Sequence, residues 1–446
     1  MKKYDVIVLG GGPAGGAVVA SLAKAGKRVA MIEATAFGGV CPLRGCNPKK
    51  VLAGGAKAVH MAASMMGSGL TGSVSIDWPA LMRFTRSFVD PVPERARAAY
   101  ADKGIDTRLG RAALIGPSEV EVEGDRLTAP VICVCVGLEP SPQPVSGAEA
   151  MPVSDDFLSM QTMPRRILFI GGGFIAFELA HIARHAGADV TILNRSERVL
   201  RQFDPVLANE LIEASRAAGI DVRLSAPVRS VERTDDGWRI RAGEDDETVF
   251  DADMAFNCTG RRPAVAGLGL DAAGVEFGPR GIAVNNRMQS VSNPNVYAVG
   301  DVADHGAALT PVATIQGQTA AANILDPDSA TVDYTGIPSV CFTLPPLAGV
   351  GLLEDEARER GLAFTIKETD LAAAFSWKQL NERFGRARVL IDEAGDRILG
   401  AHILGHNAEE MINLFALAIR NEIPLSRVRD TVWAYPTCGY ELKYMV

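Results

Sequence analysis

The chain has 446 residues, enough for roughly two to four domains, and 47% of them are hydrophobic, which is ample for packed cores. Its 45 basic and 53 acidic residues give a formal net charge of -8, which argues against nucleic acid as a partner. No apolar run is long enough to span a bilayer, and Met1-Lys2-Lys3 leads straight into an apolar segment, so we expect no signal or transit peptide. We therefore expect a cytoplasmic protein with no membrane partner, whose seven cysteines do not form a structural disulfide framework.

The first recognisable pattern is a strand, a glycine-rich turn and a helix. An apolar run over Tyr4–Leu9 precedes Gly10-Gly11-Gly12-Pro13-Ala14-Gly15, which fits G-x-G-x-x-G, and a helix is expected over 16–25. A second strand over 28–32 ends in Glu33. Such glycines let the backbone approach a pyrophosphate, the helix N-terminus faces its charge, and the acid accepts ribose hydroxyls. The pattern therefore predicts a dinucleotide site.

Two cysteines, Cys41 and Cys46, follow within the stretch Gly38-Gly39-Val40-Cys41-Pro42-Leu43-Arg44-Gly45-Cys46-Asn47-Pro48-Lys49-Lys50. Five helical residues rise about 7.5 Å, whereas the Cα atoms of a disulfide lie about 4.4–6.8 Å apart. An undistorted helix would therefore not close this pair, but Gly45 supplies the backbone freedom for a distorted first turn. The pair is a candidate reversible redox couple. The alternative is two unrelated buried thiols.

Residues 51–148 are predicted to form helices and then strands. We expect one helix from Lys50 to about Met66, a second over 78–101, and strands over 107–114, 119–123 and 131–136. Gly137 follows the last strand, and three prolines then break the chain at 140, 142 and 144, which indicates a domain crossing.

A second strand, turn and helix begin at Arg166–Ile170. The turn Gly171-Gly172-Gly173-Phe174-Ile175-Ala176 fits G-x-G-x-x-A, a helix runs to about residue 185, and the strand over 190–193 ends at Asn194. An NAD site usually carries an acid there for the ribose 2′-hydroxyl. Here Asn194 takes that place, followed by Arg195, Arg198 and Arg201. Because arginine offers a permanent, forked charge that suits a 2′-phosphate, the segment predicts NADPH; the alternative is a solvated basic loop.

The last third of the chain begins with a strand that ends in an acid, Asn295-Val296-Tyr297-Ala298-Val299-Gly300-Asp301. Thr310-Pro311 then predicts a helix start, with Thr310 at the N-cap and Pro311 at the first helical position. Beyond residue 337 the pattern favours antiparallel strands over 340–343, 363–366, 388–391 and 398–403, and an amphipathic helix over 408–421.

The cysteine stretch resembles the redox centre of the pyridine nucleotide-disulfide oxidoreductases, the flavoprotein family of glutathione reductase, dihydrolipoyl dehydrogenase and mercuric reductase. The family pattern is close to G-G-x-C-x-x-x-G-C-x-P-x-K, and both glycine turns, the 295–301 strand and Thr259-Gly260-Arg261-Arg262-Pro263 extend the resemblance over nearly the whole chain. The resemblance implies an α/β fold with two Rossmann-like dinucleotide-binding domains, for FAD and NADPH, and a C-terminal α+β interface domain. That domain would form a homodimer whose active site is completed in trans. The implied segments are 1–148 (FAD), 149–264 (NADPH), 265–335 (FAD and central) and 336–446 (interface).

The resemblance also implies roles for single residues. Cys46 would be the charge-transfer thiol beside the flavin, and Cys41 would attack the substrate. Lys50 would pair with Glu178 near flavin N5, and Lys49 is the alternative for that lysine. Phe174 would be an aromatic lid over the nicotinamide. The resemblance implies no metal. The implied cofactor-binding residues are Gly10, Gly12, Pro13, Ala14, Gly15, Glu33, Gly39, Val40, Lys50, Ala112, Gly137, Gly171, Gly173, Phe174, Ile175, Asn194, Arg195, Arg201, Gly260, Gly300, Asp301, Thr310, Pro311 and Val312.

One segment departs from the family pattern. Near its C-terminus the family has His-Pro-Thr-x-x-Glu, whose histidine is the acid–base group supplied by the partner subunit; here the segment is Tyr435-Pro436-Thr437-Cys438-Gly439-Tyr440-Glu441. The pKa of tyrosine is about 10, against about 6.5 for histidine, so Tyr435 is a poor base at neutral pH but can donate a hydrogen bond. Two alternatives stay open: Tyr435 and Glu441 as a substitute dyad, and Cys438 as either a further active thiol or a small buried side chain.

The sequence therefore predicts an FAD-dependent NADPH oxidoreductase that reduces a disulfide or related small-molecule acceptor through a Cys41–Cys46 disulfide. One alternative is dihydrolipoyl dehydrogenase, which Arg195 and Arg201 disfavour. Another is mercuric reductase, which the lack of a C-terminal cysteine pair disfavours. A third is a quinone or dioxygen reductase that works from the flavin alone. An alternative of another class is a redox-sensing flavoprotein or binding partner that uses the cysteines as a switch.

Overall fold

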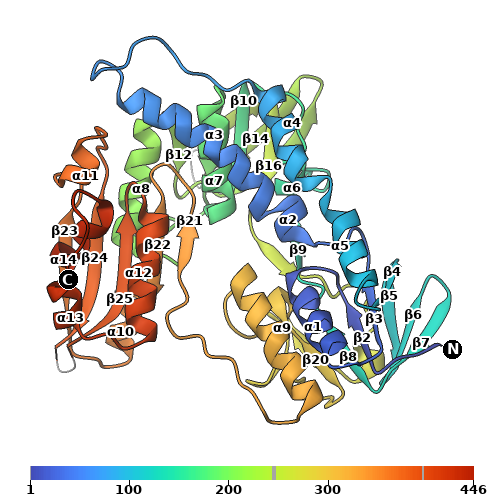
Figure 1. Cartoon of the computed structure of the whole chain (residues 1–446). Helices are drawn as coiled ribbons and strands as arrows, with labels where there is room; N and C mark the ends of the chain where they lie inside the picture. The colour runs from blue at the N-terminus through green and yellow to red at the C-terminus, as the bar shows by residue number, and fades with distance from the viewer. Residues whose placement is uncertain (1, 244–247, 394–395) are drawn as a thin grey trace. The chain divides into compact units, whose positions relative to one another are not determined.

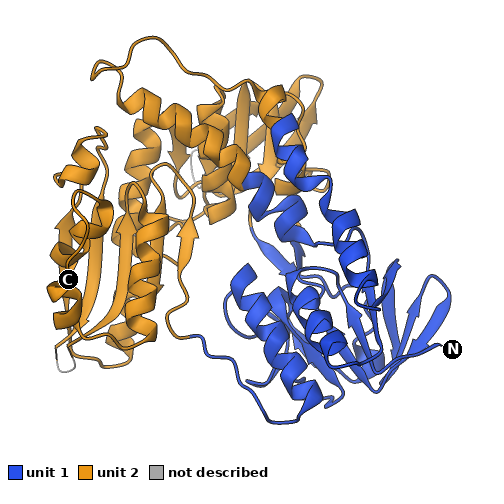
Figure 2. Ribbon diagram, viewed as in Figure 1, with its two compact units in different colours: residues 1–49, 83–141, 260–334 blue, residues 50–82, 142–259, 335–446 orange. Residues whose placement is uncertain are grey.

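The computed structural model describes residues 2–243, 248–393 and 396–446 and divides into two compact units (Figures 1 and 2). Each unit is assembled from three separate segments of the chain. Unit 1 comprises residues 1–49, 83–141 and 260–334, and unit 2 comprises residues 50–82, 142–259 and 335–446. The predicted division into four functional segments stays a prediction.

Unit 1 is built on a five-stranded parallel sheet. The order across the sheet is β20 (Val296–Ala298), β8 (Val131–Val134), β2 (Val6–Leu9), β3 (Val29–Glu33) and β4 (Asp106–Leu109). Strands β2 and β3 are buried along their whole length, as expected for parallel strands that are covered on both faces. Because parallel strands end at the same edge, the glycine turn after β2 and the Glu33 carboxylate at the end of β3 are brought together.

Helices α1 (Pro13–Lys24) and α9 (Thr310–Leu325) lie side by side in unit 1 (Figure 1). Their backbones approach so closely that a Cβ added at Gly317 would lie 2.6 Å from the Ala14 carbonyl oxygen, so only glycine fits there. The rest of unit 1 comprises α2 (Val40–Arg44), α5 (Val92–Ala101), a sheet of β1 (Lys2–Lys3), β7 (Asp125–Thr128), β6 (Glu119–Val122) and β5 (Ala112–Gly116), and the pairs β9 (Leu138–Pro140) with β17 (Arg261–Pro263) and β18 (Phe277–Gly278) with β19 (Gly281–Ile282).

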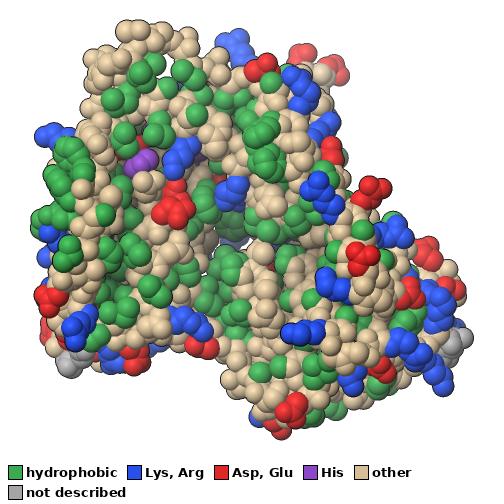
Figure 3. All heavy atoms as spheres, in the orientation of Figure 1, with side chains coloured by type: hydrophobic (Ala, Val, Ile, Leu, Met, Phe, Trp, Pro, Cys, Tyr) green, Lys and Arg blue, Asp and Glu red, His purple; other side chains and the backbone are tan. Residues whose placement is uncertain are grey.

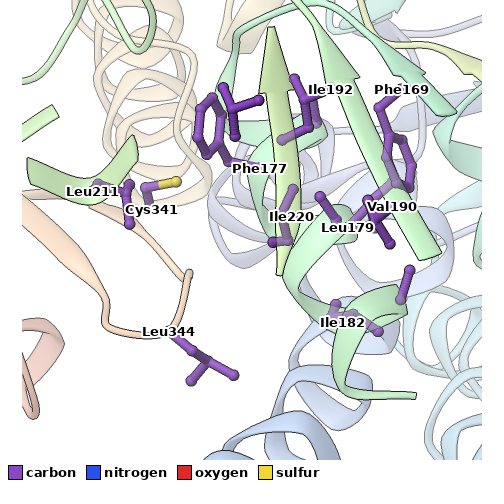
Figure 4. Close-up of a cluster of buried hydrophobic side chains, with 14 of the residues drawn as sticks. Phe169, Phe177, Leu179, Ile182, Val190, Ile192, Leu211, Ile220, Cys341 and Leu344 are labelled. Atoms are coloured by element: carbon purple, nitrogen blue, oxygen red, sulfur yellow. The ribbon is translucent and has the colours of Figure 1, made fainter. Parts of the chain in front are cut away.

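Unit 2 contains a second parallel sheet, whose order is β12 (Ile220–Arg223), β11 (Asp189–Leu193), β10 (Arg166–Ile170) and β16 (Met254–Asn257). Helix α7 (Phe174–His185) follows β10, and every residue from Ala176 to Ala183 is buried. Figure 4 shows part of this core, with Phe177 and Leu179 of α7 beside the sheet. Around it lie α3 (Cys46–Ser64), α4 (Trp78–Val89), α6 (Ser154–Phe157), α8 (Pro205–Ala217), β13 (Val228–Thr234), β14 (Gly237–Ala242) and β15 (Thr248–Ala252).

The C-terminal part of unit 2 is an antiparallel sheet. Its order is β21 (Ser339–Cys341), β22 (Leu347–Gly351), β25 (Arg397–Leu404), β24 (Arg386–Asp392) and β23 (Phe364–Asp370). Helix α12 (Ala408–Arg420) packs on β22 and β25, and the shorter helices are α10 (Glu354–Glu359), α11 (Phe375–Lys378), α13 (Leu425–Asp430) and α14 (Leu442–Met445). Two parallel sheets with glycine turns and this antiparallel sheet confirm the predicted fold class.

A buried arginine ties this antiparallel sheet to helix α8 within unit 2. Arg388 of β24 is 5% exposed and donates hydrogen bonds to Asp204, to Glu354 at 2.9 Å and to Glu368 at 2.9 Å. Asp204 is also the N-cap of α8, where its side chain accepts from the backbone N–H of Leu207 at 3.0 Å. A buried charge is tolerated only when it is paired, so the three carboxylates fix the position of Arg388.

Several sequence-based predictions of elements were wrong. The strand expected over 107–114 is two strands of different sheets, β4 and β5, separated at Gly110, whose φ is 152°. The single helix expected over 78–101 is two helices, α4 and α5, because Pro91 and Pro93 interrupt the helical hydrogen bonds. Thr310 is the first residue of α9 rather than its N-cap, which is Leu309 without a side-chain hydrogen bond. Strand β22 was missed because its sequence, Leu-Ala-Gly-Val-Gly, contains two glycines and is preceded by two prolines, a composition that favours a loop.

Basic and acidic side chains are interspersed over the face of the molecule shown in Figure 3. Within the described ranges, no helix is both long enough and apolar enough to cross a membrane.

Candidate active site

The first glycine turn lies at the end of β2 in unit 1. Gly10 has a φ of 111°, and a Cβ there would lie 2.3 Å from the Cys135 carbonyl oxygen, so both conformation and space require glycine. The Glu33 carboxylate accepts hydrogen bonds from the backbone N–H of Gly11 at 2.7 Å and of Thr35 at 2.8 Å. The turn and the acid are thereby fixed next to each other, as a site for a ribose and its pyrophosphate requires.

A second turn of the same unit carries Gly300 and Asp301. Gln316 of α9 accepts a hydrogen bond from the Gly300 backbone N–H at 2.8 Å and donates to the His305 carbonyl oxygen at 2.7 Å. Burial raises the pKa of the Asp301 carboxyl, and Arg261 acts in the opposite direction. The sequence analysis missed Gln316; its one signal is a polar residue on a helix otherwise rich in alanine and other small residues.

The two candidate redox cysteines lie on either side of a break between helices α2 and α3. Cys41 is the second residue of α2, Gly45 separates the helices, and Cys46 is the first residue of α3. A Cβ at Gly45 would lie 3.0 Å from the Val40 carbonyl oxygen, tighter than an ordinary contact. The predicted distortion at Gly45 is therefore confirmed.

Both cysteines are thiols in this structure, but their surroundings differ. Cys46 is exposed, and its Sγ lies 3.8 Å from the Thr310 Oγ1 at the start of α9. Cys41 is half-buried; its hydrogen bond with Cys46 and its burial raise the pKa of the Cys41 thiol. The N-terminus of a helix favours the thiolate form of a cysteine, so the place of Cys46 at the start of α3 suits the charge-transfer role that the family resemblance implies for it.

The second glycine turn, in unit 2, repeats the geometry of the first. Gly171 has a φ of 125°, and a Cβ there would lie 2.3 Å from the Cys258 carbonyl oxygen, just as at Gly10. At Gly172 a Cβ would lie 2.6 Å from the Asn194 side chain, whereas at Gly173 the turn is open, since a Cβ there would meet no atom within 4 Å. Gly173 is also the N-cap of α7, and the N-terminus of a helix is suited to bind an anion.

Three arginines lie on the loop that follows β11. Asn194 is buried and its Nδ2 donates to the carbonyl oxygens of Ser196 at 2.7 Å and of Arg198 at 3.2 Å, which shapes the loop. Arg195, Arg198 and Arg201 are exposed on it. The loop thus presents several cations close to the second glycine turn.

Lys50 and Glu178 both contact Phe342, a residue that the sequence analysis did not single out. The Lys50 Nζ lies 2.6 Å from the centroid of the Phe342 ring. Glu178 of α7 is 1% exposed, and its Oε1 accepts from the Phe342 backbone N–H at 2.8 Å. Phe174, the predicted lid, is 39% exposed at the first turn of α7. Nothing in the spacing of the sequence links position 342 to the other two.

The C-terminal segment places aromatic rings where the family pattern has its acid–base dyad. Tyr435 is 65% exposed and its ring meets that of Tyr440 edge to face, with centroids 4.8 Å apart. Glu441 is buried, which raises the pKa of its carboxyl. Cys438 is half-buried, burial raises the pKa of its thiol, and its Sγ accepts from Asn407 Nδ2 at 3.6 Å.

The other predicted cofactor-binding residues lie around these turns. A Cβ at Gly39 would lie 2.5 Å from the Gly12 Cα, so the first glycine turn and the start of α2 meet without side chains. The residues of unit 1 therefore fit FAD, and those around Gly171 fit a nicotinamide dinucleotide. Six of the remaining predicted cofactor-binding residues lie in the first turns of α1, α2, α7 and α9: Pro13, Ala14, Val40, Ile175, Pro311 and Val312. Ala112 is at the start of β5, Gly137 lies after β8, and Gly260 lies just before β17.

None of the described His, Cys, Asp and Glu side chains form a group of three or more suited to hold a metal ion. Three of the six histidines cluster between α3 and α7. The ring centroids of His60 and His185 lie 5.5 Å apart, and those of His181 and His185 lie 6.2 Å apart.

Comparisons with known proteins give consistent results. The family described as pyridine nucleotide-disulphide oxidoreductase matches residues 4–317, and its dimerisation domain matches residues 337–446. The chain is 33% identical over 460 residues to a glutathione reductase of Burkholderia cepacia, covering 99% of this chain and 98% of the relative. It is 31% identical over 445 residues to a dihydrolipoyl dehydrogenase of Chlamydia muridarum, covering 98% of this chain and 94% of the relative.

A mercuric reductase of Lysinibacillus sphaericus is 29% identical over 446 residues, covering 99% of this chain and 82% of the relative. Among solved structures, the Cu(II) complex of the HOCl-induced flavoprotein disulfide reductase RclA from Escherichia coli superposes with a TM-score of 0.89. It shares 26% sequence identity and covers 100% of this chain and 99% of its own.

Proposed function

Because this chain belongs to the pyridine nucleotide-disulphide oxidoreductase family and is a flavoprotein disulfide reductase with the pair Cys41–Cys46, we propose that it uses FAD and NADPH. Its substrate is a small-molecule acceptor whose leaving group is acidic. FAD, when bound, relays an electron pair from the nicotinamide to the cysteine pair. The observation that carries the proposal is the unequal pair: an exposed Cys46 at the N-terminus of α3 beside Thr310, and a Cys41 whose pKa is raised by Cys46 and by burial.

The two cysteines act in sequence on a disulfide acceptor. The Cys41 sulfur attacks one sulfur of the acceptor, which forms a mixed disulfide and releases one thiolate. The Cys46 thiolate then attacks the Cys41 sulfur, which releases the second thiol and restores the Cys41–Cys46 disulfide. Each step needs a proton for the departing sulfur and a thiolate for attack. Tyr435 of the partner subunit would donate a hydrogen bond to the departing sulfur, but it supplies no base for Cys41.

NADPH is proposed over NADH because of the loop after β11. Asn194 stands where an acid would repel a 2′-phosphate, and it holds the loop on which Arg195 and Arg201 are exposed. A charge-assisted hydrogen bond contributes about 1.5–3 kcal/mol when it is shielded, and less at exposed sites. Two such contacts support a preference for NADPH of at least roughly tenfold in catalytic efficiency.

The test is flavin reduction by NADPH and by NADH, followed anaerobically by stopped flow on the purified holoenzyme. The double variant Arg195→Gln/Arg201→Gln should lose most of the preference, while the control Arg198→Gln should keep it. Equal efficiency of the two cofactors in the wild type, or a preference for NADH, would exclude the NADPH assignment.

A second candidate acceptor is a soft metal ion. Thiolates are the preferred ligands of such ions, and here an exposed Cys46 lies beside a half-buried Cys41. A curated relative is a mercuric reductase, and the solved RclA structure is a Cu(II) complex. In this reaction one NADPH would reduce one Hg(II) to Hg(0), or two Cu(II) to two Cu(I). NADPH oxidation should then depend on added Hg(II) or Cu(II) and be lost in Cys41→Ser; equal rates with and without the metal salts would exclude it.

A further inference from the structure

Phe342 is the first residue after β21, and it contacts the two charged residues assigned to the flavin. The centroid of its ring lies 2.6 Å from the Lys50 Nζ. Its backbone N–H donates a hydrogen bond to the Glu178 Oε1 at 2.8 Å. Lys50 belongs to α3 and Glu178 to α7, so one residue of a third element connects both.

We propose that Phe342 is a positioning residue for this pair: its ring holds the Lys50 ammonium, and its backbone amide holds the Glu178 carboxylate. The inference rests on the proposed function and on the role that the family resemblance implies for Lys50 and Glu178, a pair near flavin N5. It adds to the active site a residue from the segment between β21 and β22. That segment is separate from both glycine turns and from the cysteine pair.

The ring suits this task because of how it binds a cation. The face of an aromatic ring attracts an ammonium group electrostatically, within about 6 Å of the centroid. The contact is electrostatic and leaves the ammonium group charged. A carboxylate in place of Phe342 would instead compete with Glu178 for the same ammonium.

The backbone of Phe342 is held independently of its side chain. Cys341, the residue before it, pairs with Leu347 in the ladder between β21 and β22. Thr343, the residue after it, is 1% exposed and its hydroxyl donates to the Pro345 carbonyl oxygen at 2.7 Å. Replacing the ring should therefore leave the hydrogen bond from the amide to Glu178 in place, so the two contacts can be tested separately.

The contact between Lys50 and the ring can be measured without any turnover. We would label the holoenzyme with a low dose of acetic anhydride and quantify the acetylation rate of Lys50 by mass spectrometry. Phe342→Leu, which removes the π face but keeps an apolar side chain, should raise that rate about tenfold, whereas Phe342→Tyr should leave it within about threefold of wild type. Lys57 is the internal control, since it lies on the same helix and pairs with Glu409 at 2.7 Å.

A second measurement reads the effect on the flavin. The two-electron midpoint potential and the rate of flavin reduction by NADPH should both change in Phe342→Leu, the rate by about tenfold, and both should be restored in Phe342→Tyr. Glu178→Gln keeps the oxygen that accepts from the Phe342 amide but removes the charge, so it shows how much of the effect on the flavin depends on the carboxylate rather than on the ring. FAD content and the melting temperature show whether each variant folds, and Phe342→Met replaces Phe342→Leu if the latter does not.

Unchanged acetylation of Lys50 in Phe342→Leu, or Phe342→Tyr as reactive as Phe342→Leu, would overturn the inference. So would an equal increase at Lys57. If NADPH fails to reduce the flavin in the wild type, the proposed function is wrong, but the labelling result still decides whether Phe342 holds Lys50.

Discussion

At the residue scale, the chemistry depends on the inequality of Cys41 and Cys46. Cys46 opens helix α3 and contacts Thr310, whereas Cys41 is half-buried in α2 with a raised pKa. A thiolate at a helix N-terminus is stabilised by the helix dipole. In the proposed function the negative charge of the reduced pair therefore resides on the Cys46 sulfur, and Cys41 attacks the acceptor.

The first prediction separates these roles by substitution. Reduced wild-type holoenzyme should show a long-wavelength absorption band that arises from the Cys46 thiolate beside the flavin. Cys46→Ser should abolish the band, because a serine hydroxyl stays protonated, while Cys41→Ser should keep the band and lose turnover of disulfides. Cys438→Ser is the control and should change neither. The assignment fails if both active-site variants still reduce disulfides at the wild-type rate.

The second prediction concerns Tyr435, which is 65% exposed and packs on Tyr440. A positioned acid–base group contributes about 10²–10⁴-fold to a proton-coupled step, and a neutral phenol cannot act as the base. Wild type should therefore be reduced rapidly by NADPH but turn over glutathione disulfide slowly, and Tyr435→His should raise that turnover.

Steady-state rates of wild type, Tyr435→His and Tyr435→Phe with glutathione disulfide and lipoamide test this prediction. Wild-type rates of roughly 10²–10³ s⁻¹ with either compound, the upper end of typical enzymes, would refute it. Such rates would instead support Tyr435 and Glu441 as a substitute dyad.

At the scale of elements, helix α7 combines a cofactor role at its start with a buried histidine cluster near its end. The Ser215 hydroxyl donates to the Leu211 carbonyl oxygen, so the His181 Nε2, 3.0 Å from that hydroxyl, must be the donor. Among the described residues the His181 Nδ1 then has no hydrogen-bond partner. The His185 Nδ1 lies 2.8 Å from the His181 carbonyl oxygen, to which it donates. Each ring thus donates from one nitrogen, and burial, which lowers both pKa values, favours the neutral form of each ring.

The third prediction follows from these neutral rings. Burial lowers the pKa of His181, and burial lowers the pKa of His185 to about 4. Above about pH 6.5, the pKa of an unfolded histidine, neither state of the protein binds the proton and stability is unaffected. As the pH falls from 6.5 towards 4, the unfolded state binds protons that the native state does not, so stability falls. For His185 alone the loss between pH 7.5 and 5 is about 2 kcal/mol.

Urea unfolding of the holoenzyme at pH 7.5, 6 and 5 measures this loss. His185→Gln should be less stable or equal to wild type at pH 7.5 but should show a flatter decrease towards pH 5. A decrease as steep as that of the wild type would contradict the assignment of His185 as neutral in the native state.

At the scale of the whole molecule, residues 337–446 match a dimerisation domain. In this domain a cavity of about 120 Å³ is lined mainly by apolar side chains, among them Leu414, Leu417 and Trp433. Leu417 is 56% exposed in the single chain. Large apolar side chains grouped at a surface favour a protein contact, and the active site proposed here needs Tyr435 of the partner subunit.

The fourth prediction is that the chain is a dimer and that Leu417→Arg weakens it. A charge placed in an apolar interface must be desolvated, which should raise the dimer dissociation constant at least about tenfold. Analytical ultracentrifugation over a range of concentrations measures the change. Leu325→Arg, at an exposed leucine at the end of α9 in unit 1, is the matched control. Loss of the dimer in the control but not in Leu417→Arg would place the interface elsewhere.

Much of the site was predictable because its parts are local in sequence. Gly10 and Gly171 each need a positive φ and a close backbone contact, which only glycine tolerates, so both turns are visible as motifs. Cys41, Gly45 and Cys46 lie within one short stretch. Phe342 escaped because its contacts are with segments far away in the chain, and Gln316 escaped because it holds the backbone of a nearby turn; neither kind of contact leaves a spacing pattern.

The sequence by itself determined the two strand, turn and helix units and placed Asn194 where an acid is usual, and its resemblance to the family pattern implied the redox pair and Tyr435 in place of the acid–base histidine. Each follows from residue types at fixed short spacings, where backbone geometry and side-chain chemistry leave few choices. Only the tertiary structure decided that Cys41 has a raised pKa, that Glu178 and Lys50 meet at Phe342, and that Arg388 joins β24 to α8. These features depend on burial and on contacts between distant segments, and folding, rather than local pattern, brings those segments together.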